Sequence, residues 1–326
     1  MLELTHCPGT LKAGYATYSS TALRRVFNGR LVSHILPYDC PASNAKTDAI
    51  YTRNRRRLSI SGVQEKFSVV LDKNKLRLTE EGERGTYILK PIPGAGIRSD
   101  QMPANEHLSM QLARQLFGIE TAENALIFFQ NGAPAYLTKR FDVQDDGSKW
   151  AQEDFATLAG RTPQTHGKDF KYLGNYLDLF RLMQIHVPAY AVEAPKLFRL
   201  ILFNYLISNG DAHLKNFSLL ETPMGDFKLS PAYDLLNSSI HIQDSPFALS
   251  EGLLPKSEDK GKVAQRFRVL GERAGIAKQQ LDGIFEDLIS KEEEVVALID
   301  VSYLNAKTKR NYRQAYQRRL NKLLRA

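Results

Sequence analysis

The stretch Asn209-Gly210-Asp211-Ala212-His213-Leu214-Lys215-Asn216 is the most informative part of this sequence of 326 residues. The apolar run before it, residues 196–208, predicts a buried central helix that ends at Asn209-Gly210. Asp211 is followed by Asn216 five residues later, and a second carboxylate, Asp234, stands eighteen residues after that, beyond a short predicted strand. One carboxylate, one amide oxygen and phosphate oxygens suffice to hold Mg²⁺, which prefers hard oxygen ligands and keeps several waters.

This spacing is typical of the catalytic loop of kinases. There, an aspartate accepts the proton of the attacking hydroxyl, and an asparagine five residues later holds a metal ion on the nucleotide phosphates. Asp234 stands where a kinase keeps its main magnesium ligand. Each signal alone has a common structural explanation, since Asn-Gly-Asp is frequent in turns and an aspartate often caps a strand end. Together and in this order they predict kinase chemistry that uses ATP and Mg²⁺.

The first half of the chain reads as strands with few helices, and the second half as helices. The predicted strands cover residues 67–71, 76–78, 87–90, 125–129 and 135–141, and a predicted helix covers residues 105–117. After about residue 150 the helical segments include residues 281–289. We predict an α+β, bilobal protein-kinase-like fold with a strand-rich N-terminal lobe (1–142) and a helical C-terminal lobe (143–326). A cleft between the lobes is the expected ligand site.

The strand-rich half contains a lysine and a glutamate that suit this chemistry. Lys90 ends a predicted strand, as does the lysine that binds the α- and β-phosphates in kinases. Glu106 opens the following helix, so it can orient Lys90 through an ion pair. The ordinary alternatives are a strand-edge lysine and an acid that complements the helix dipole.

Two further segments are candidates for nucleotide contacts. Residues 59–66, with the sequence Ser-Ile-Ser-Gly-Val-Gln-Glu-Lys, precede the first predicted strand. They contain one glycine, so they are not a glycine-rich phosphate loop by count, although free N–H groups there could cradle a phosphate. Lys139-Arg140-Phe141 stands where a hinge would present backbone groups to adenine.

With these residues in view, the chain resembles the HipA family of serine/threonine kinase toxins. The resemblance runs from about residue 59 to 236 and rests on Ser59–Lys66, Ile88-Leu89-Lys90-Pro91, Asn105-Glu106, Lys139-Arg140-Phe141-Asp142, Glu153-Asp154-Phe155, Asn209–Asn216 and Pro231-Ala232-Tyr233-Asp234-Leu235. The segment before residue 59 is short for the N-terminal subdomain of long HipA proteins. The chain therefore looks more like the short form, HipT, in which a separate small protein, HipS, resembles the missing subdomain.

The resemblance implies a role for each matching residue. Asp211 would be the catalytic base, Asn216 and Asp234 the magnesium ligands, and Lys90 the ligand of the α- and β-phosphates. The remaining ATP contacts would come from Ser61, Gly62, Val63, Gln64, Lys66, Lys139, Arg140, Phe141 and His213. Of these, we expect His213 to steady the loop, and the neighbouring Lys215 to contact the transferring phosphate.

The resemblance also implies regulation and partners. Ser59 and Ser61 would be autophosphorylation sites, and because a phosphoserine carries about two negative charges, it would repel the phosphates of ATP. The family's targets are aminoacyl-tRNA synthetases, and its members are restrained by HipB, a helix-turn-helix antitoxin. DNA would be contacted only indirectly, through that antitoxin.

Composition sets the remaining expectations. The net charge is +8 and the pI is near 9.3, with basic clusters at residues 53–57 and 307–325, which favours anionic partners. We interpret the second cluster as a solvated helix face rather than a nucleic-acid site. Two cysteines and the lack of a long apolar run predict a protein of the cytoplasm without membrane spans.

Two other functions remain open from the sequence. A small-molecule kinase of the aminoglycoside or choline type also uses a Gly-Asp loop with Asn five residues on. A kinase-shaped module without catalysis, acting in an antitoxin–DNA assembly, is the second. The complete set of Lys90, Asp211, Asn216 and Asp234 argues against the latter, and autophosphorylation would argue against the former.

Overall fold

The computed structural model describes residues 3–40, 65–144, 146–243 and 245–325. The chain forms two compact units that are interleaved in sequence. Unit 1 comprises Met1–Gln111, Ala122–Ser148 and Ala297–Lys309, and unit 2 comprises Leu112–Thr121, Lys149–Val296 and Arg310–Ala326. The functional division into lobes 1–142 and 143–326 stays a prediction. Each compact unit contains segments from both halves of the chain.

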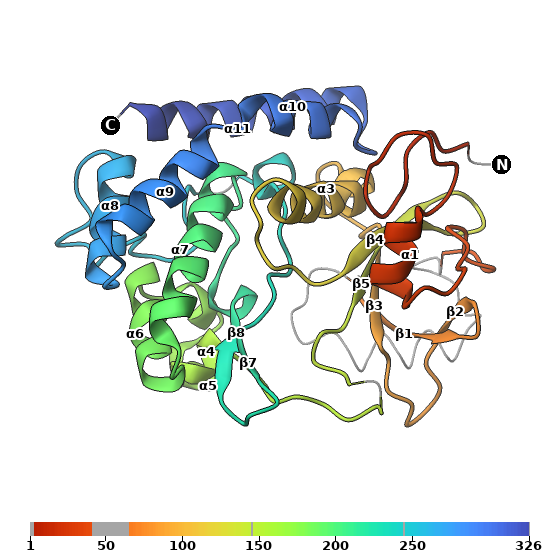
Figure 1. The fold of residues 1–326 in the computed structure, drawn as a ribbon, viewed down its shortest axis with the longest axis horizontal. Coiled ribbons are helices and arrows are strands. Elements are labelled where there is room, and N and C mark those ends of the chain that lie inside the picture. Colours follow the sequence, from red (N-terminus) through yellow and green to blue (C-terminus); the bar gives the residue numbers. More distant parts are fainter. Residues whose placement is uncertain (1–2, 41–64, 145, 244, 326) are drawn as a thin grey trace. The chain divides into compact units, whose positions relative to one another are not determined.

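Unit 1 is built on an antiparallel sheet with the strand order β2-β1-β3-β5-β4 (Figure 1). The strands are β1 (Phe67–Asp72), β2 (Lys75–Leu78), β3 (Tyr87–Pro91), β4 (Asn124–Phe128) and β5 (Pro134–Lys139). β1 and β2 form the expected hairpin, in which Lys73 turns the chain with a positive φ of 53°. The central strand β3 carries Lys90 at its C-terminal end.

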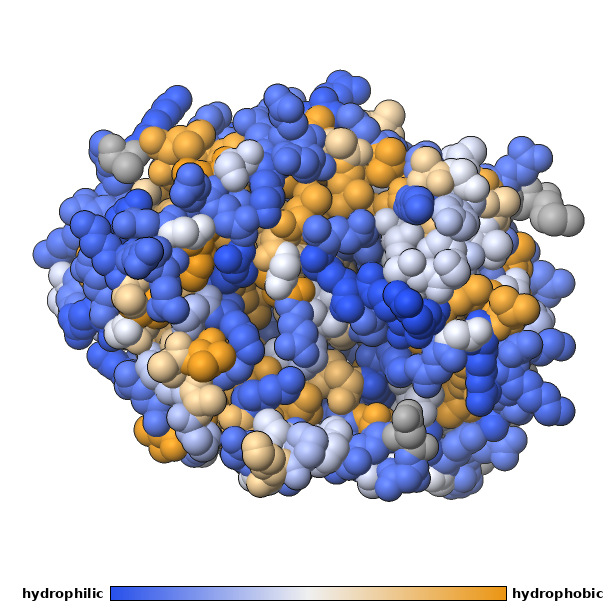
Figure 2. Space-filling model, in the orientation of Figure 1, coloured by the Kyte–Doolittle hydropathy of each residue, from blue (hydrophilic) through white to orange (hydrophobic). Residues whose placement is uncertain are grey.

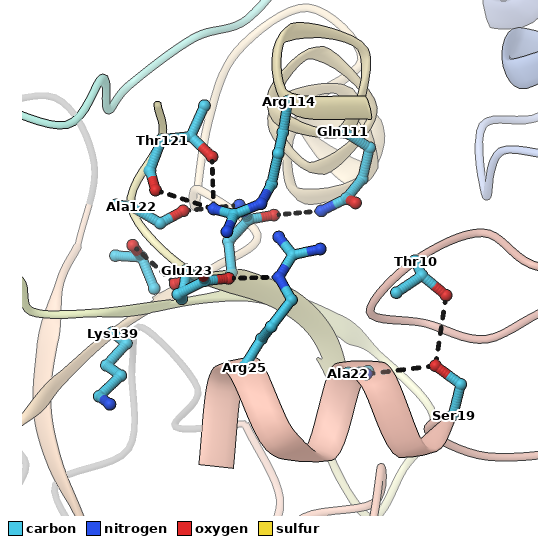
Figure 3. A network of polar contacts seen from close by, with 12 residues as sticks. Thr10, Ser19, Ala22, Arg25, Gln111, Arg114, Thr121, Ala122, Glu123 and Lys139 are labelled. Atoms are coloured by element: carbon cyan, nitrogen blue, oxygen red, sulfur yellow. Dashed lines mark hydrogen bonds and ion pairs between the residues drawn. The ribbon is translucent and has the colours of Figure 1, made fainter. Parts of the chain in front are cut away.

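The N-terminal segment completes the core of unit 1. Helix α1 (Ser20–Phe27) is capped at its N-terminus by Ser19, whose side chain accepts a hydrogen bond from the Ala22 N–H. Val26 and Phe27 of this helix are buried in one cluster with the inward-facing residues of the sheet. Figure 3 shows α1 tied to the residue before β4 by an ion pair between Arg25 and Glu123, with 2.9 Å from Nε to Oε2.

Helix α3 (Met102–Gln115) is more polar inside than the sequence pattern indicates. Its predicted stripe includes Leu108 and Leu112, both fully buried. Glu106, His107 and Gln111 are buried as well, and each therefore needs a partner or a neutral form. Gln111 donates from Nε2 to Asn124 Oδ1 at 2.9 Å, and burial lowers the pKa of His107 to about 3.

Unit 2 is mainly helical, with a small antiparallel sheet of the order β6-β7-β8. Its strands are β6 (Gln152–Asp154), β7 (Ser218–Glu221) and β8 (Phe227–Leu229). The described helices that lie wholly or partly in this unit, besides α3, are α4 (Phe155–Leu158), α5 (Pro163–His166), α6 (Tyr176–His186), α7 (Tyr190–Leu206), α8 (Val263–Arg273), α9 (Lys278–Ile289), α10 (Glu292–Asp300) and α11 (Ala306–Leu324). The short 3₁₀ segments among the described residues are Ser99–Gln101, Phe170–Tyr172, Leu214–Asn216 and Ser238–Ile240.

Helix α7 is the central helix of unit 2, as expected from its apolar sequence. Phe198 on this helix packs against Phe267 of α8 and Phe285 of α9, with ring centroids 6.2 and 5.9 Å apart. The helix begins at Tyr190, six residues before the predicted start, and contains Pro195. The prediction followed the apolar run that starts at residue 196 and so omitted the first six residues of the helix, among which Pro195 removes one helical hydrogen bond.

Several predicted elements differ from the structure at their ends. The last strand of unit 1 ends at Lys139 instead of residue 141, because its partner β3 begins at Tyr87, which pairs with Lys139. Arg140 and Phe141 therefore lie outside the sheet. Helix α3 begins at Met102, three residues before its predicted start.

The described helices do not include one that is both long and apolar enough to cross a bilayer. The face shown in Figure 2 is covered mainly by hydrophilic residues, with apolar residues in small groups. Scattered apolar groups of this kind are ordinary on protein surfaces.

Candidate functional site

The 209–216 loop begins where the hydrogen bonding of α7 ends. Asn209 donates from its side chain to Asn204 Oδ1 at 2.7 Å, and from its backbone N–H to the Asn204 carbonyl at 2.8 Å. Ser208 between them has a φ of 60°, a left-handed conformation that costs a non-glycine residue about 1 kcal/mol. The two bonds to Asn204 hold this sharp turn and direct the chain away from the helix axis.

A serine from a distant segment fixes the loop from its other side. Ser238 accepts a hydrogen bond from the Gly210 N–H at 2.8 Å, and it donates to the Ser208 carbonyl at 3.2 Å. Ser238 is 3% exposed, so water competes little for these bonds. The backbone on both sides of Asn209 is thereby fixed before Asp211 begins.

Asp211 is held by a tyrosine that the sequence analysis missed. The Tyr172 hydroxyl donates to Asp211 Oδ1 at 2.8 Å. Burial first, then the hydrogen bond and charge of Asp211, raise the pKa of Tyr172, so its hydroxyl keeps the proton at neutral pH. Tyr176 supports the same loop, since its hydroxyl donates to the Ala212 carbonyl at 2.8 Å. Nothing in the local sequence links residue 172 to residue 211.

His213 lies inside the loop and is neutral. It is 7% exposed, and its ring makes an edge contact with Tyr172 at a centroid distance of 5.2 Å. Burial lowers the pKa of His213 to about 4; the charge of Lys171 also lowers it, while Asp211 opposes this shift. A neutral imidazole adds no positive charge beside Asp211. The expected steadying role of His213 stays a prediction.

Asn216 and Asp234 come together at the end of the loop. Asn216 Oδ1 accepts the His213 N–H at 3.1 Å, and Asn216 Nδ2 lies 3.4 Å from Asp234 Oδ2. Asp234 has a φ of 55°, a strained conformation of the kind found at functional sites. An amide oxygen has two lone pairs, so Asn216 Oδ1 can accept this bond and bind a cation. The donor set, one carboxylate and one amide oxygen, suits Mg²⁺.

Lys215 is engaged with an acid of the small sheet. Its Nζ lies 2.7 Å from Asp154 Oδ2, and the Lys215 side chain is 35% exposed. Asp154 also caps helix α4 by accepting the Thr157 N–H at 2.9 Å. A contact between Lys215 and a transferring phosphate, which we expected from the sequence, would have to replace or share this ion pair.

In unit 1, the structure brings Lys90 and Glu106 together. Lys90 Nζ donates to Glu106 Oε1 at 2.6 Å, and both side chains are almost fully buried, at 4% and 3% exposure. The Lys90 ammonium also lies 5.3 Å from the centre of the Tyr136 ring. Because burying two charges costs free energy that their attraction only partly returns, a pair in this position is a candidate for function.

The residues expected near adenine are already bonded within unit 1. The N–H groups of Lys139 and Arg140 donate to the carbonyls of Glu123 and Thr86. The Lys139 side chain, drawn in Figure 3, donates to Asn28 Oδ1 at 2.6 Å, and Arg140 pairs with Asp142 at 2.5 Å. These two N–H groups are thus committed to protein partners, and an adenine contact here would need a carbonyl or Phe141.

Part of the expected phosphate-binding segment lies outside the described residues. Lys66 directly precedes β1 and is half-buried. The predictions for the rest of this segment fall outside the described part of the chain: Ser59, Ser61, Gly62, Val63 and Gln64.

Comparison with known proteins assigns the family. Residues 58–296 match the family described as the HipA-like C-terminal domain. The chain belongs to this family. A Haemophilus influenzae protein named "Putative kinase" is 25% identical, with 88% of this chain and 87% of that protein covered. "Putative kinase Y4mE" of Sinorhizobium fredii is 32% identical, with 70% of this chain but only 49% of that protein covered.

A serine/threonine kinase toxin is matched over a smaller part of the chain. The serine/threonine-protein kinase toxin HipA of Shewanella oneidensis is 26% identical, over 57% of this chain and 44% of that protein. The chain thus spans about half the length of the S. fredii and S. oneidensis relatives. Membership of this kinase family implies that this chain uses ATP.

Solved structures confirm the predicted fold class. HipA of S. oneidensis, in complex with HipB and operator DNA, has a TM-score of 0.62 at 19% identity, covering 82% of this chain and 65% of that one. The Helicobacter pylori proinflammatory kinase CtkA has a TM-score of 0.52 at 14% identity, covering 78% and 92%. At such low identity the likeness concerns the fold, a mixed α+β kinase-like one with a sheet followed by helices.

Proposed function

We propose that this chain is an ATP-dependent serine/threonine protein kinase of the HipA toxin type. The observation that carries the proposal is the Asp211–Asn216 loop with Asp234 beside it, in which Asn216 Nδ2 lies 3.4 Å from Asp234 Oδ2. Family membership supports the kinase class, and the buried Lys90–Glu106 pair supports nucleotide binding. Neither of these observations identifies the acceptor.

In the proposed reaction, Asp211 accepts the proton of the attacking serine hydroxyl. Among the described residues, Tyr172 is the side chain that we find hydrogen-bonded to this carboxylate, through Oδ1. Oδ2 is then the oxygen available to the substrate. The bond from Tyr172 fixes the carboxylate orientation, so that a hydroxyl approaching from one side meets an acceptor that does not need to rotate.

The other proposed roles follow the chemistry of the side chains. Lys90, oriented by Glu106, would bind the α- and β-phosphates, and Asn216 with Asp234 would hold Mg²⁺. A bound Mg²⁺ would neutralise charge that develops on the phosphate oxygens. The backbone N–H of His213 keeps Asn216 in place by donating to Asn216 Oδ1.

We further propose the short, HipT-like form of the toxin. The support is that the H. influenzae protein is matched over 87% of its length, whereas the S. oneidensis toxin is matched over 44%. A HipS-like small protein and a HipB-like antitoxin would be its partners, and DNA would be reached through the antitoxin. The proposed substrate is an aminoacyl-tRNA synthetase, and Ser59 and Ser61 are the proposed autophosphorylation sites.

The proposal is tested by intact-mass spectrometry after the dephosphorylated protein is incubated with ATP and Mg²⁺. We expect one or two phosphate additions, mapped by peptide analysis to Ser59, Ser61 or both. The Asp211→Asn variant should gain none. The matched control is Asp282→Asn, which removes the same charge from an exposed ion pair with Arg268, and it should behave as the wild type.

Other outcomes point to other functions. If no phosphate is added although nucleotide binds, and a panel of hydroxylated small molecules is phosphorylated instead, the chain is a small-molecule kinase. If neither is modified, it is a binding module without catalysis. Phosphorylation that persists in Asp211→Asn would remove Asp211 from the proposed mechanism.

A further inference from the structure

Unit 2 contains a basic pocket whose lining residues do not include Asp211, Asn216 or Asp234. It has a volume of about 690 Å³, and it is lined by residues of α8, α11 and the 245–252 segment. Five of its lining side chains are cationic: Lys262, Arg266, Arg319, Lys322 and Arg325. Two carboxylates, Glu251 and Asp259, also line it.

The two carboxylates of the pocket already have partners. Asp259 forms an ion pair with Arg266, with Arg266 Nε 2.6 Å from Asp259 Oδ1. Glu251 Oε2 accepts a hydrogen bond from Asn175 Nδ2 at 2.9 Å. Within the described ranges we find no carboxylate paired with Lys322 or Arg325, both of which are exposed. The pocket therefore carries a surplus of positive charge whose members repel one another.

Aromatic rings hold the arginines of the pocket in place. The Tyr205 and Phe247 rings stack with centroids 5.4 Å apart and an angle of 24°. The Arg319 guanidinium lies 4.9 Å from the Tyr205 centroid, and that of Arg266 lies 5.4 Å from the Phe247 centroid. Stacking fixes the plane of each guanidinium; Arg266 is further held by Asp259 and Arg319 by a bond from Nε to Ser208 Oγ, which leaves the remaining N–H groups of Arg319 for an anion. Two of the five cations, Arg266 and Arg319, are thus positioned before any ligand binds.

The helix dipoles favour only some of the five cations at their positions in the pocket. Lys322 lies in the last turn of α11, where a cation complements the helix dipole. Lys262, by contrast, is the N-cap residue of α8, whose first turn contains no acidic residue. A cation at that end is opposed by the dipole, so the dipole of α8 favours an anion here, in the same sense as the side chains.

We propose that this pocket binds a phosphoryl group. Arginine presents a planar fork of donors that matches phosphate oxygens, and lysine adds a point charge, so the mixture suits a compact dianion better than a single carboxylate. Ser245, exposed and on the rim, is one source of such a group. The other source is a soluble phosphate compound.

Phosphorylation of Ser245 is an ordinary transfer from ATP. Ser245 Oγ would form a bond to the γ-phosphorus while the bond between that phosphorus and the leaving ADP breaks, and the hydroxyl proton would pass to a base. The resulting phosphoserine would carry about two negative charges into the surplus of cations.

The pocket is connected to the 209–216 loop by hydrogen bonds. Arg319 Nε donates to Ser208 Oγ at 3.3 Å, directly before the loop. The Ser250 N–H donates to the Tyr172 carbonyl at 2.8 Å, and the Tyr172 hydroxyl holds Asp211. An effect of the bound phosphoryl group on catalysis would rest on the proposed function, whereas the binding itself does not.

The binding is tested by isothermal titration calorimetry of the full chain with inorganic phosphate at constant ionic strength. We expect saturable binding that the double variant Lys322→Gln/Arg325→Gln weakens by roughly tenfold or more. The control is the same calorimetric titration of Arg318→Gln, which removes one positive charge from an exposed residue of the same helix that does not line the pocket. That variant should bind phosphate as the wild type does.

Three results would overturn the proposal. The first is phosphate binding no stronger than that of chloride at equal ionic strength. The second is an equal loss in Arg318→Gln, which would indicate general charge attraction. The third is tight binding of a random DNA duplex through Lys322 and Arg325 with which phosphate does not compete, because the pocket would then be a nucleic-acid surface.

The source of the phosphoryl group is identified by mass spectrometry of the purified protein. A phosphate on the peptide that contains Ser245, together with phosphate binding that is blocked until a phosphatase removes it, assigns the pocket to that serine. An unmodified Ser245 with saturable phosphate binding assigns it to a soluble compound. Either assignment of the phosphoryl source can be made even if the chain shows no kinase activity.

Discussion

Tyr172 is the residue through which Asp211 keeps its orientation. Its hydroxyl donates to Asp211 Oδ1 at 2.8 Å. For the proposed kinase reaction, we expect Tyr172→Phe to lower kcat by about tenfold, the worth of one hydrogen bond to a charged group, with little change in KM. Steady-state kinetics with ATP as the varied substrate measure kcat and KM separately. Tyr190→Phe, which removes a hydroxyl bonded to the distant Ala274 carbonyl, should leave kcat unchanged, and an equal loss in both variants would contradict a positioning role for Tyr172.

The Lys90–Glu106 pair makes a prediction about stability. Glu106→Gln removes the carboxylate that lies 2.6 Å from the buried ammonium of Lys90, and we expect a loss of about 3 kcal/mol or more in the free energy of unfolding. Asp282→Asn breaks an ion pair whose side chains are 44% and 48% exposed, and it should cost less than about 1 kcal/mol. Urea denaturation of both variants checks this difference. Similar losses would show that burial adds nothing to the first pair.

His213 predicts how stability depends on pH. Its pKa in the folded chain is about 4, below the ordinary value of 6.5. Between these values the unfolded chain binds a proton that the folded chain does not, so stability is present above pH 6.5 and is lost as the pH falls toward 4. The loss from this residue is about 3 kcal/mol.

The measurement is the free energy of unfolding from urea titrations at several pH values. We expect His213→Asn to flatten the profile over this range, whatever its effect at neutral pH. The charges facing His213 are those of Asp211, Asp234 and Lys171, and His107 adds a loss of the same sign because its pKa is also lowered. An unchanged slope in His213→Asn would contradict the prediction.

At the scale of elements, two glycines in neighbouring helices predict opposite effects. A Cβ added at Gly283 of α9 meets no atom within 4 Å, because this residue lines a cavity of about 450 Å³. A Cβ added at Gly271 of α8 would lie 2.2 Å from a methyl group of Leu281. We expect Gly283→Ala to stabilise the protein by up to about 1 kcal/mol, through helix propensity, and Gly271→Ala to destabilise it. Thermal unfolding of the two variants gives the signs, and two changes of the same sign would contradict the packing described for these helices.

The elements also show which parts of the fold the sequence could predict. The β1–β2 hairpin and the apolar α7 were predicted because turn residues and periodicity act locally. The end of β5 at Lys139 was not, since it depends on where β3 begins. Likewise, the buried Gln111 of α3 is explained by its bond to Asn124 in another element, which no local pattern indicates.

The site follows the same division between local and distant information. Asp211, Asn216 and Asp234 were identified as candidates from spacing alone, and the structure places Asn216 beside Asp234. Tyr172 and Ser238, which hold the loop, come from segments 39 and 28 residues from their partners. Their contacts depend on tertiary structure, so one sequence contains no sign of them.

At the scale of the whole molecule, the family is established by residues 58–296, about three quarters of the chain. The central claim of the proposed function is the identity of the acceptor of the phosphoryl group. That identity is determined by the surface of the chain and by the surface of its partner. A net charge of +8 favours anionic partners, but it does not distinguish a protein substrate from a nucleotide or a nucleic acid.

The most direct test is to incubate the protein with ATP, Mg²⁺ and a panel of purified aminoacyl-tRNA synthetases, and to map phosphoserine by mass spectrometry. The account predicts that one synthetase is modified on a serine of its ATP-binding loop by the wild type and by Asp282→Asn. The Asp211→Asn variant should not modify it. A panel that stays unmodified while the wild type phosphorylates a small hydroxylated molecule would contradict the account.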